Sequence, residues 1–128
     1  MPILDANVIL RYLLNDLTDQ AEAAKSAVLA GASTTVEVLA EVVYVLNGVY
    51  KADRITIATA LTAFLQEIEV PHKDALLYAL QLYSVRKLDF VDCVLAGYRH
   101  VDGVNVVTFD SKLQKVLMTD PFSQNTDE

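Results

Sequence analysis

The 128-residue sequence contains a single cysteine, four glycines and no long apolar run. One cysteine excludes an internal disulfide and a metal site built from several thiolates. The four glycines form no Gly-rich loop of the kind that cradles phosphate groups. No apolar stretch approaches the roughly 20 residues of a membrane span, and the start lacks the basic and apolar regions of a signal peptide. We therefore expect a cytoplasmic protein without membrane contact.

Positive charge is also scarce. Ten Lys and Arg residues stand against 17 Asp and Glu residues, which gives a formal net charge of −7 and a pI of about 4.6. Because contacts to phosphate need Lys and Arg, this balance argues against binding of polyanions through a generally basic surface. A role with nucleic acid would require a local source of positive charge.

Apolar residues, by contrast, are abundant. They make up 53% of the chain, the mean hydropathy is +0.31, and the length suits one domain with a real core. We expect that domain to span residues 1–120 and the polar stretch 121–128 to be a flexible C-terminal tail. Cys93 lies among Val91, Val94 and Leu95, which predicts a buried structural thiol.

Short strand-like segments alternate with longer helix-like segments. Strands are predicted at 3–4, 32–35, 68–70 and 104–109, and helices after Asn7, at 19–30, at 36–47, at 54–66, from Asp74, from about Asp89 and at 111–118. Strands separated by helices favour right-handed crossovers. The predicted fold class is α/β, with a small, mostly parallel sheet flanked by helices on both faces in three layers.

Local signals also predict how several helices begin. Asn7 is a suitable N-cap for the first helix, and Thr18 for the second. Thr34 and Glu37 fit the capping box of the third, in which the Thr hydroxyl and the Glu carboxylate bond each other's backbone amides. Glu37 then has a local role, whereas Glu41, one turn later in a largely apolar helix, has none and is the better candidate for function.

Four acidic residues are placed where a parallel sheet would bring them to one edge. Asp5 follows the first strand, Asp110 follows the strand 104–109, and Glu41 and Asp92 lie near the starts of two helices. Ligands bind at that edge in open α/β sheets. Each acid also has a local alternative, since Asp5, Asp92 and Asp110 suit turns or helix starts and Glu41 can reach solvent.

Convergence of these four acids has an electrostatic consequence. Two unit charges ~5 Å apart repel by roughly 3 kcal/mol at an effective dielectric constant of about 20. Such a group attracts cations, and oxygen ligands without nearby Cys or His suit Mg²⁺ or Mn²⁺. These ions bridge to phosphate and acidify bound water. The predicted reaction class is hydrolysis of a phosphodiester.

Four motifs carry a family resemblance. Residues 4–10 (LDANVIL), 38–46 (VLAEVVYVL), 89–96 (DFVDCVLA) and 107–110 (VTFD) resemble the motifs of PIN-domain ribonucleases, and above all those of VapC-type toxins of toxin–antitoxin pairs. The resemblance implies a PIN-like α/β/α fold, Mg²⁺- or Mn²⁺-dependent cleavage of RNA, a homodimer, and inhibition by a cognate antitoxin protein. It assigns the catalytic and metal-binding positions to Asp5, Glu41, Asp92 and Asp110.

Two residues near the first motif qualify this assignment. The family often has Thr or Ser after the first Asp, and this chain has Ala6, so a hydroxyl beside the metal is missing. That leaves the acids intact but affects the surroundings of the ligands. Arg11, one or two turns beyond Asp5, is a candidate contact for substrate phosphate and equally an arginine without such a role.

Two other functions remain open. In a phosphoaspartate or phosphatase-type domain, Asp5 would be the nucleophile and the other acids would hold Mg²⁺, although no second acid follows two residues after Asp5 and only Lys112 is a near candidate for the phosphoryl contact. In a non-catalytic module, the acidic rim would bind a basic peptide. Metal-dependent RNA cleavage separates both from a ribonuclease.

Overall fold

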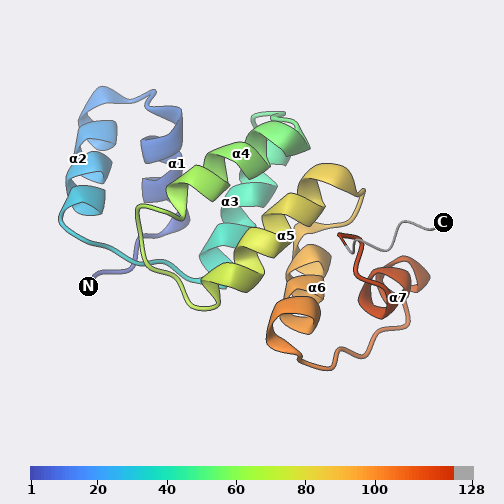
Figure 1. The fold of residues 1–128 in the computed structure, drawn as a ribbon. Coiled ribbons are helices and arrows are strands. Elements are labelled where there is room, and N and C mark those ends of the chain that lie inside the picture. The colour runs from blue at the N-terminus through green and yellow to red at the C-terminus, as the bar shows by residue number, and fades with distance from the viewer. Residues whose placement is uncertain (123–128) are drawn as a thin grey trace.

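The computed structural model describes residues 1–122, which form seven helices (Figure 1). They are α1 (Ala6–Leu14), α2 (Thr18–Leu29), α3 (Val36–Gly48), α4 (Arg54–Phe64), α5 (Lys73–Val85), α6 (Phe90–Asp102) and α7 (Ser111–Met118). Each predicted helix is confirmed, with bounds that differ by no more than about two residues because helix ends are weakly specified. No helix within residues 1–122 combines the length and apolar character that crossing a bilayer requires.

The predicted α/β fold, with a mostly parallel sheet between two helical layers, is wrong for the described residues. The segments at 3, 33 and 69 meet only in two isolated parallel bridges, Ile3 with Ser33 and Ser33 with Glu69. Each bridge joins single residues, so none of these segments pairs over the length of a regular strand. The architecture of residues 1–122 is therefore helical.

The segment 104–109 is the largest single difference from the predicted sheet. It has the alternating apolar pattern of a strand, yet it makes no bridge to another part of residues 1–122. Val107 and Phe109 are 90% and 98% exposed. An alternating pattern shows that a segment can form a strand, but a sheet forms only when a neighbouring strand pairs with it.

Helix α5 lies at the centre of the structure, packed against α4 on one side and α6 on the other. The pair α1 and α2 lies at one end and α7 at the other (Figure 1). The core is continuous across them and contains fully buried aliphatic and aromatic side chains, among them Ile9, Leu39, Leu61, Phe64, Leu76, Leu80 and Leu113. Burial of such side chains supplies about 1.5–3 kcal/mol each.

Helices α5 and α6 lie close together at Gly97. A Cβ atom at this position would lie 2.4 Å from the carbonyl oxygen of Ala75 in α5. Glycine inside a helix costs about 1 kcal/mol relative to alanine. The presence of glycine at position 97 is therefore explained by the close packing of the two helix backbones and not by the helix propensity of glycine.

Arg54, at the start of α4, fixes the connection between α5 and α6. Its Nη1 atom donates to the carbonyl oxygens of Tyr83, Arg86 and Leu88 at 3.1, 2.8 and 2.8 Å. Its guanidinium also lies 4.1 Å from the centroid of the Tyr83 ring. Carbonyls at the C-terminal end of a helix lack helical partners, so the half-buried guanidinium of Arg54 stabilises both the end of α5 and the residues that lead to α6.

Three predicted helix caps are wrong. Thr18 is the first residue of α2 and not its cap; the N-cap residue is Leu17, and no side chain caps this helix. Asp5 and not Asn7 caps α1, since its carboxylate accepts from the Val8 amide at 3.0 Å. Thr35 and not Thr34 caps α3 and accepts from the Val38 amide at 3.2 Å. The reason is that Thr34 is buried and its hydroxyl donates to the Leu4 carbonyl at 3.1 Å. The capping box of Thr34 with Glu37 is therefore absent from the described structure.

The thiol of Cys93 is buried, as predicted, and donates to the Leu88 carbonyl at 3.9 Å. Burial raises the pKa of this thiol to about 12, so it stays protonated and unreactive near neutral pH. Near the predicted tail, Tyr78 donates to the Asp120 carboxylate at 2.7 Å and its ring packs against Phe122. The rest of that tail, residues 123–128, lies outside the described residues.

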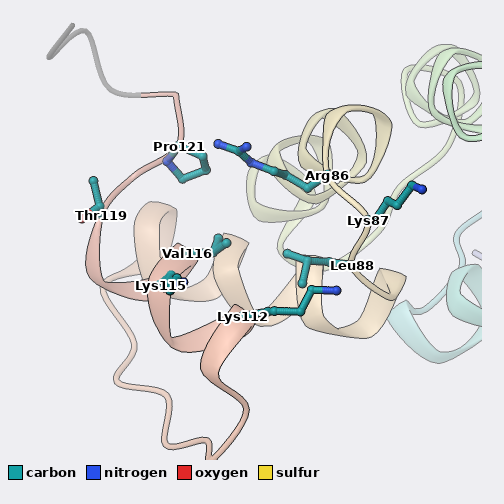
Figure 2. Close-up of a pocket in the computed structure, with 8 residues that line it drawn as sticks. All are labelled: Arg86, Lys87, Leu88, Lys112, Lys115, Val116, Thr119 and Pro121. Carbon is teal, nitrogen blue, oxygen red and sulfur yellow. The ribbon is translucent and has the colours of Figure 1, made fainter. Parts of the chain in front are cut away.

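Helix α7 packs on α6 and leaves a hollow beside the connection between α5 and α6 (Figure 2). The volume of this hollow is about 390 Å³. Arg86 and Lys87 line it from the connection, and Lys112 and Lys115 line it from α7. It is a locally basic surface on an acidic chain.

Substitution of alanine for glycine should have opposite effects at two positions. Gly97→Ala should lower the free energy of unfolding by about 1–3 kcal/mol, because the new methyl group meets the Ala75 carbonyl. Gly48→Ala, at the end of α3 with no heavy atom within 4 Å, should raise it by about 0.5–1 kcal/mol. Urea unfolding measures both, and a Gly97→Ala protein as stable as the parent would contradict the close approach of α5 and α6.

Candidate functional site

Asp92 belongs to a group of three acidic residues that interact through charge. It lies in the first turn of α6, and Asp89 is the N-cap residue of the same helix. Burial raises the pKa of the Asp92 carboxyl, and the negative charges of Asp89 and Asp110 raise it further. Two of the four predicted site residues, Asp92 and Asp110, are thus close enough to affect each other.

Asp110 reaches this position because it caps α7. Its carboxylate accepts from the amides of Lys112 and Leu113 at 2.9 and 3.0 Å. Since α7 packs on α6, the start of α7 comes near the start of α6. The local alternative considered for Asp110 is therefore present, and the same residue also contributes charge to the acidic group.

A hollow of about 570 Å³ lies beside Asp89 and Asp92, between α3 and α6. Its walls include Tyr44 and Asn47 of α3 and Arg54 of α4. Tyr44 is 77% exposed, and Arg54 is engaged with the carbonyls at the end of α5. The hollow has acidic residues on one wall and an exposed aromatic ring on another.

Asp5 lies elsewhere in the described structure. It caps α1 and lines a different hollow, of about 410 Å³, together with Asn7, Arg11 and residues of α2. The charges that act on Asp92 come from Asp89 and Asp110, and Asp5 is not among them. Asp5 and Asp92 therefore line different hollows.

Glu41 is exposed on α3 and lines neither of these two hollows. Glu37, one turn earlier, is also exposed, and its charge contributes to a raised pKa of Tyr98 on α6. Because Thr35 caps α3 without Glu37, the local role predicted for Glu37 does not apply. Both glutamates are thus exposed acids one turn apart on α3, and neither caps this helix.

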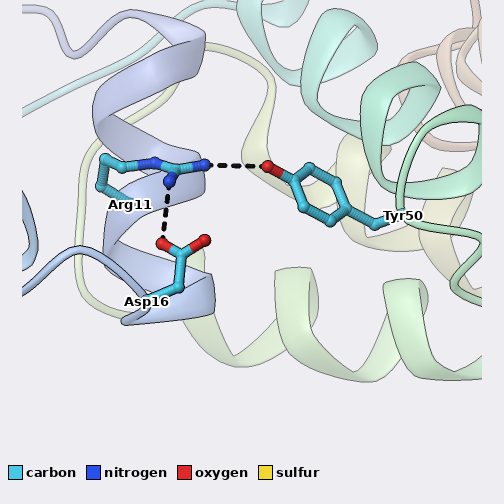
Figure 3. A network of polar contacts seen from close by, with 3 residues as sticks. All are labelled: Arg11, Asp16 and Tyr50. Atoms are coloured by element: carbon cyan, nitrogen blue, oxygen red, sulfur yellow. Dashed lines mark hydrogen bonds and ion pairs between the residues drawn. The ribbon is translucent and has the colours of Figure 1, made fainter.

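The guanidinium of Arg11 contacts two other side chains of the protein, those of Asp16 and Tyr50 (Figure 3). Its guanidinium forms an ion pair with Asp16 at 2.8 Å and donates to the Tyr50 hydroxyl at 3.0 Å. The residue is 8% exposed, and its Nε atom has no hydrogen-bond partner among residues 1–122. Arg11 therefore ties α1 to the connection between α3 and α4, and both of its terminal nitrogens are already engaged.

The donor atoms of the acidic group suit a divalent cation, but their arrangement does not form a complete binding site. Carboxylate oxygens are the donors that Mg²⁺ and Mn²⁺ prefer. Within residues 1–122, however, no three Asp, Glu, His or Cys side chains are arranged around one metal position. Asp89, Asp92 and Asp110 accordingly supply negative charge and hard ligands without forming a complete site of their own.

Two contributors were not singled out from the sequence as site residues. In the sequence Asp89 marks only the start of a helix, although its spacing of three from Asp92 places both residues on one side of the first turn. Arg54 had no detectable signal, because its partners are backbone carbonyls about 30 residues later in the chain. Such a contact follows from tertiary packing and has no sequence pattern.

Comparison with known proteins gives one family. The model of the PIN domain family matches residues 3–117, a range that includes Asp5, Glu41, Asp92 and Asp110. The curated proteins and the solved structures contain no significant match. Because the family match covers most of the 128 residues, the chain belongs to the PIN domain family, whose members are generally nucleases.

Proposed function

We propose that this protein is an endoribonuclease that hydrolyses RNA phosphodiester bonds with Mg²⁺ or Mn²⁺. The observation that carries the proposal is the acidic group around Asp92 in a chain of the PIN domain family, whose nucleases act on RNA. Carboxylates that repel one another favour a bound cation, because the cation relieves the repulsion. The chain has this electrostatic feature at the starts of α6 and α7.

Asp5, Glu41, Asp92 and Asp110 are the proposed catalytic acids. For Asp92 and Asp110 the support is their mutual charge interaction, and for Asp5 and Glu41 it is the motif resemblance within the matched family range. The half-buried carboxylate of Asp92 is suited to accept a hydrogen bond from the attacking water and to orient it. General acid–base assistance of this kind contributes about 10²–10⁴-fold to a rate.

Members of the family typically use divalent metals. Asp92 and Asp110 would hold the ion in this chain, with water and substrate phosphate completing its coordination. When bound, the ion supplies positive charge to the phosphate and lowers the pKa of a coordinated water. Asp89 adds negative charge beside these two acids and is a further candidate ligand.

The finer proposal is that the protein is the toxin of a toxin–antitoxin pair. It rests on the resemblance of the four motifs to those of VapC-type toxins. A homodimer and a cognate antitoxin partner belong to the same proposal. Exposed apolar side chains around α7 support a partner surface, since Val107, Phe109 and Met118 are each at least 83% exposed.

Two alternatives remain distinguishable by experiment. In a phosphoaspartate or phosphatase-type domain, a phosphoryl donor would label Asp5, and RNA would not be cut. In a non-catalytic module, the acidic group would bind basic peptides without turnover. Membership of a generally nucleolytic family favours the ribonuclease over both.

Substitutions of the acids test the proposed activity. Asp92→Asn and Asp110→Asn should lower kcat/KM for cleavage of a fluorescent single-stranded RNA by about 100-fold or more, since each removes an acid from the charged group. Asp5→Asn and Glu41→Gln should do the same if the four acids act together. Asp19→Asn, an exposed acid in the first turn of α2, is the matched control and should retain activity. Full activity of Asp92→Asn would refute the mechanism.

Metal should also stabilise the fold. A ligand that binds only the native state adds RT ln(1 + [L]/Kd), so 1 mM Mg²⁺ with a Kd near ~0.1 mM adds about 1.4 kcal/mol. The Tm of the parent should therefore rise with Mg²⁺ or Mn²⁺, and the rise should be smaller for Asp92→Asn and Asp110→Asn. A Tm that does not change with the concentration of either ion would count against a metal at the acidic group.

The pH dependence of stability should differ in sign between two aspartates. The pKa of Asp92 is raised by burial and by like charge, so its ionisation destabilises the native state as pH rises above the ordinary Asp range. The pKa of Asp53 is lowered by hydrogen bonds from Thr56, so its ionisation stabilises that state. The free energy of unfolding of Asp92→Asn, measured relative to the parent, should therefore be higher at pH 7 than at pH 3. For Asp53→Asn the same difference should be lower at pH 7 than at pH 3. Thermal unfolding at both pH values measures the two trends, and trends of equal sign would contradict the charge environment of Asp92.

A further inference from the structure

Four cationic side chains surround the hollow between α7 and the connection from α5 to α6 (Figure 2). Arg86 extends from the end of α5 toward Pro121, and Lys112 lies alongside Leu88. Lys115 lies one turn further along α7. Lys87 also lines the hollow, and its side chain points away from α7. Four of the ten Lys and Arg residues of the chain thus gather in one place, although the net charge is −7.

These four side chains also lack protein partners within residues 1–122, where none forms an ion pair or a side-chain hydrogen bond. Five of the six other Lys and Arg residues do have partners, the exception being Lys51: Arg11 pairs with Asp16, Lys25 pairs with Glu22, and Lys73, Arg54 and Arg99 donate hydrogen bonds. The helix dipole does not account for Lys112 either. A cation in the first turn of a helix is unfavourable, and Lys112 is the second residue of α7.

The basic hollow adjoins the acidic group along both segments of the chain. Lys87 precedes Asp89 by two residues, and Lys112 follows Asp110 by two. Asp89 and Asp110 are the two charges that act on Asp92. A polyanion held by the cations would therefore pass next to the carboxylates at which hydrolysis is proposed.

We propose that the basic hollow formed by Arg86, Lys87, Lys112 and Lys115 binds the phosphodiester backbone of single-stranded RNA and leads it to Asp92. This inference rests on the proposed ribonuclease function and adds to it the surface that an acidic protein needs for an acidic substrate. A volume of about 390 Å³ is roughly ten times that of a water molecule, so the hollow accommodates a length of chain and not only one small ion.

The surroundings favour RNA over an acidic peptide. Phe109, which is 98% exposed, comes directly before Asp110 at the start of α7. Proteins that bind single strands combine a basic groove with aromatic rings on which bases stack. A peptide carboxylate would gain from the same cations, but it would gain nothing from a position beside carboxylates that act on phosphate.

A binding experiment tests the hollow separately from catalysis. The probe is a fluorescein-labelled single-stranded RNA of 12 nucleotides, followed by fluorescence anisotropy in EDTA, so that metal-dependent cleavage is absent. Lys112→Gln/Lys115→Gln should raise the Kd about tenfold at 0.1 M salt. It should also reduce the slope of log K against log[salt] by about 1.4, because each lost phosphate contact on a single strand removes roughly 0.7.

The matched control removes two positive charges elsewhere. Lys25→Gln/Arg99→Gln changes the net charge equally, and both residues lie outside the hollow. Its Kd should stay within about twofold of the parent. If the control weakens RNA binding as much as the test variant does, overall charge and not the hollow is responsible, and the proposal is overturned. Equal Tm values for the exposed variants exclude unfolding as the cause.

Cleavage assays with metal separate failure of the hollow from failure of the function. If the parent cuts RNA, the test variant should raise KM about tenfold and leave kcat within about twofold. Unchanged Kd and KM would overturn the hollow while the ribonuclease function stands. If the parent cuts no RNA but binding still depends on Lys112 and Lys115, the function fails and the hollow stands. A poly-glutamate peptide of equal charge that competes as well as RNA would assign the hollow to an acidic protein segment and overturn the proposal.

Discussion

The contact between α5 and α6 decides where the acidic group lies. At Gly97 the two helix backbones are so close that a single added methyl group would meet the carbonyl oxygen of Ala75. At the other end of this pair, Arg54 holds three carbonyls, the last of which belongs to Leu88, one residue before Asp89. The start of α6 is therefore held by packing and by a cation, and Asp89 and Asp92 take their positions from it.

The separation of charge on this surface follows from the same arrangement. Helix α7 packs on α6 and brings its capping residue, Asp110, toward Asp92. The next turn of α7 and the connection before α6 carry the cations of the basic hollow. Carboxylates and cations thus lie side by side without forming ion pairs within residues 1–122. Each set remains available for a ligand of opposite charge.

The helices could be predicted from the sequence because their signals are local. Apolar spacing and Asp110 before α7 act within a few residues, and the structure has them as predicted. The sheet could not be predicted in this way, since a strand requires a partner from a distant part of the chain. The same holds for Thr34, whose hydroxyl donates to Leu4, 30 residues away, so that Thr35 caps α3 instead.

Some features of the candidate site could likewise be predicted from the sequence, and others depend on the tertiary structure. The sequence by itself determined the acidic motifs, the scarcity of positive charge and the membership of the PIN domain family, because these depend on residue types and their spacing. Only the tertiary structure decided that Asp92 interacts with Asp89 and Asp110, that Asp5 lies beside another hollow, and that four cations meet between α7 and the end of α5. The physical reason is that charge interactions depend on distance in space, and that distance is set by how the helices pack.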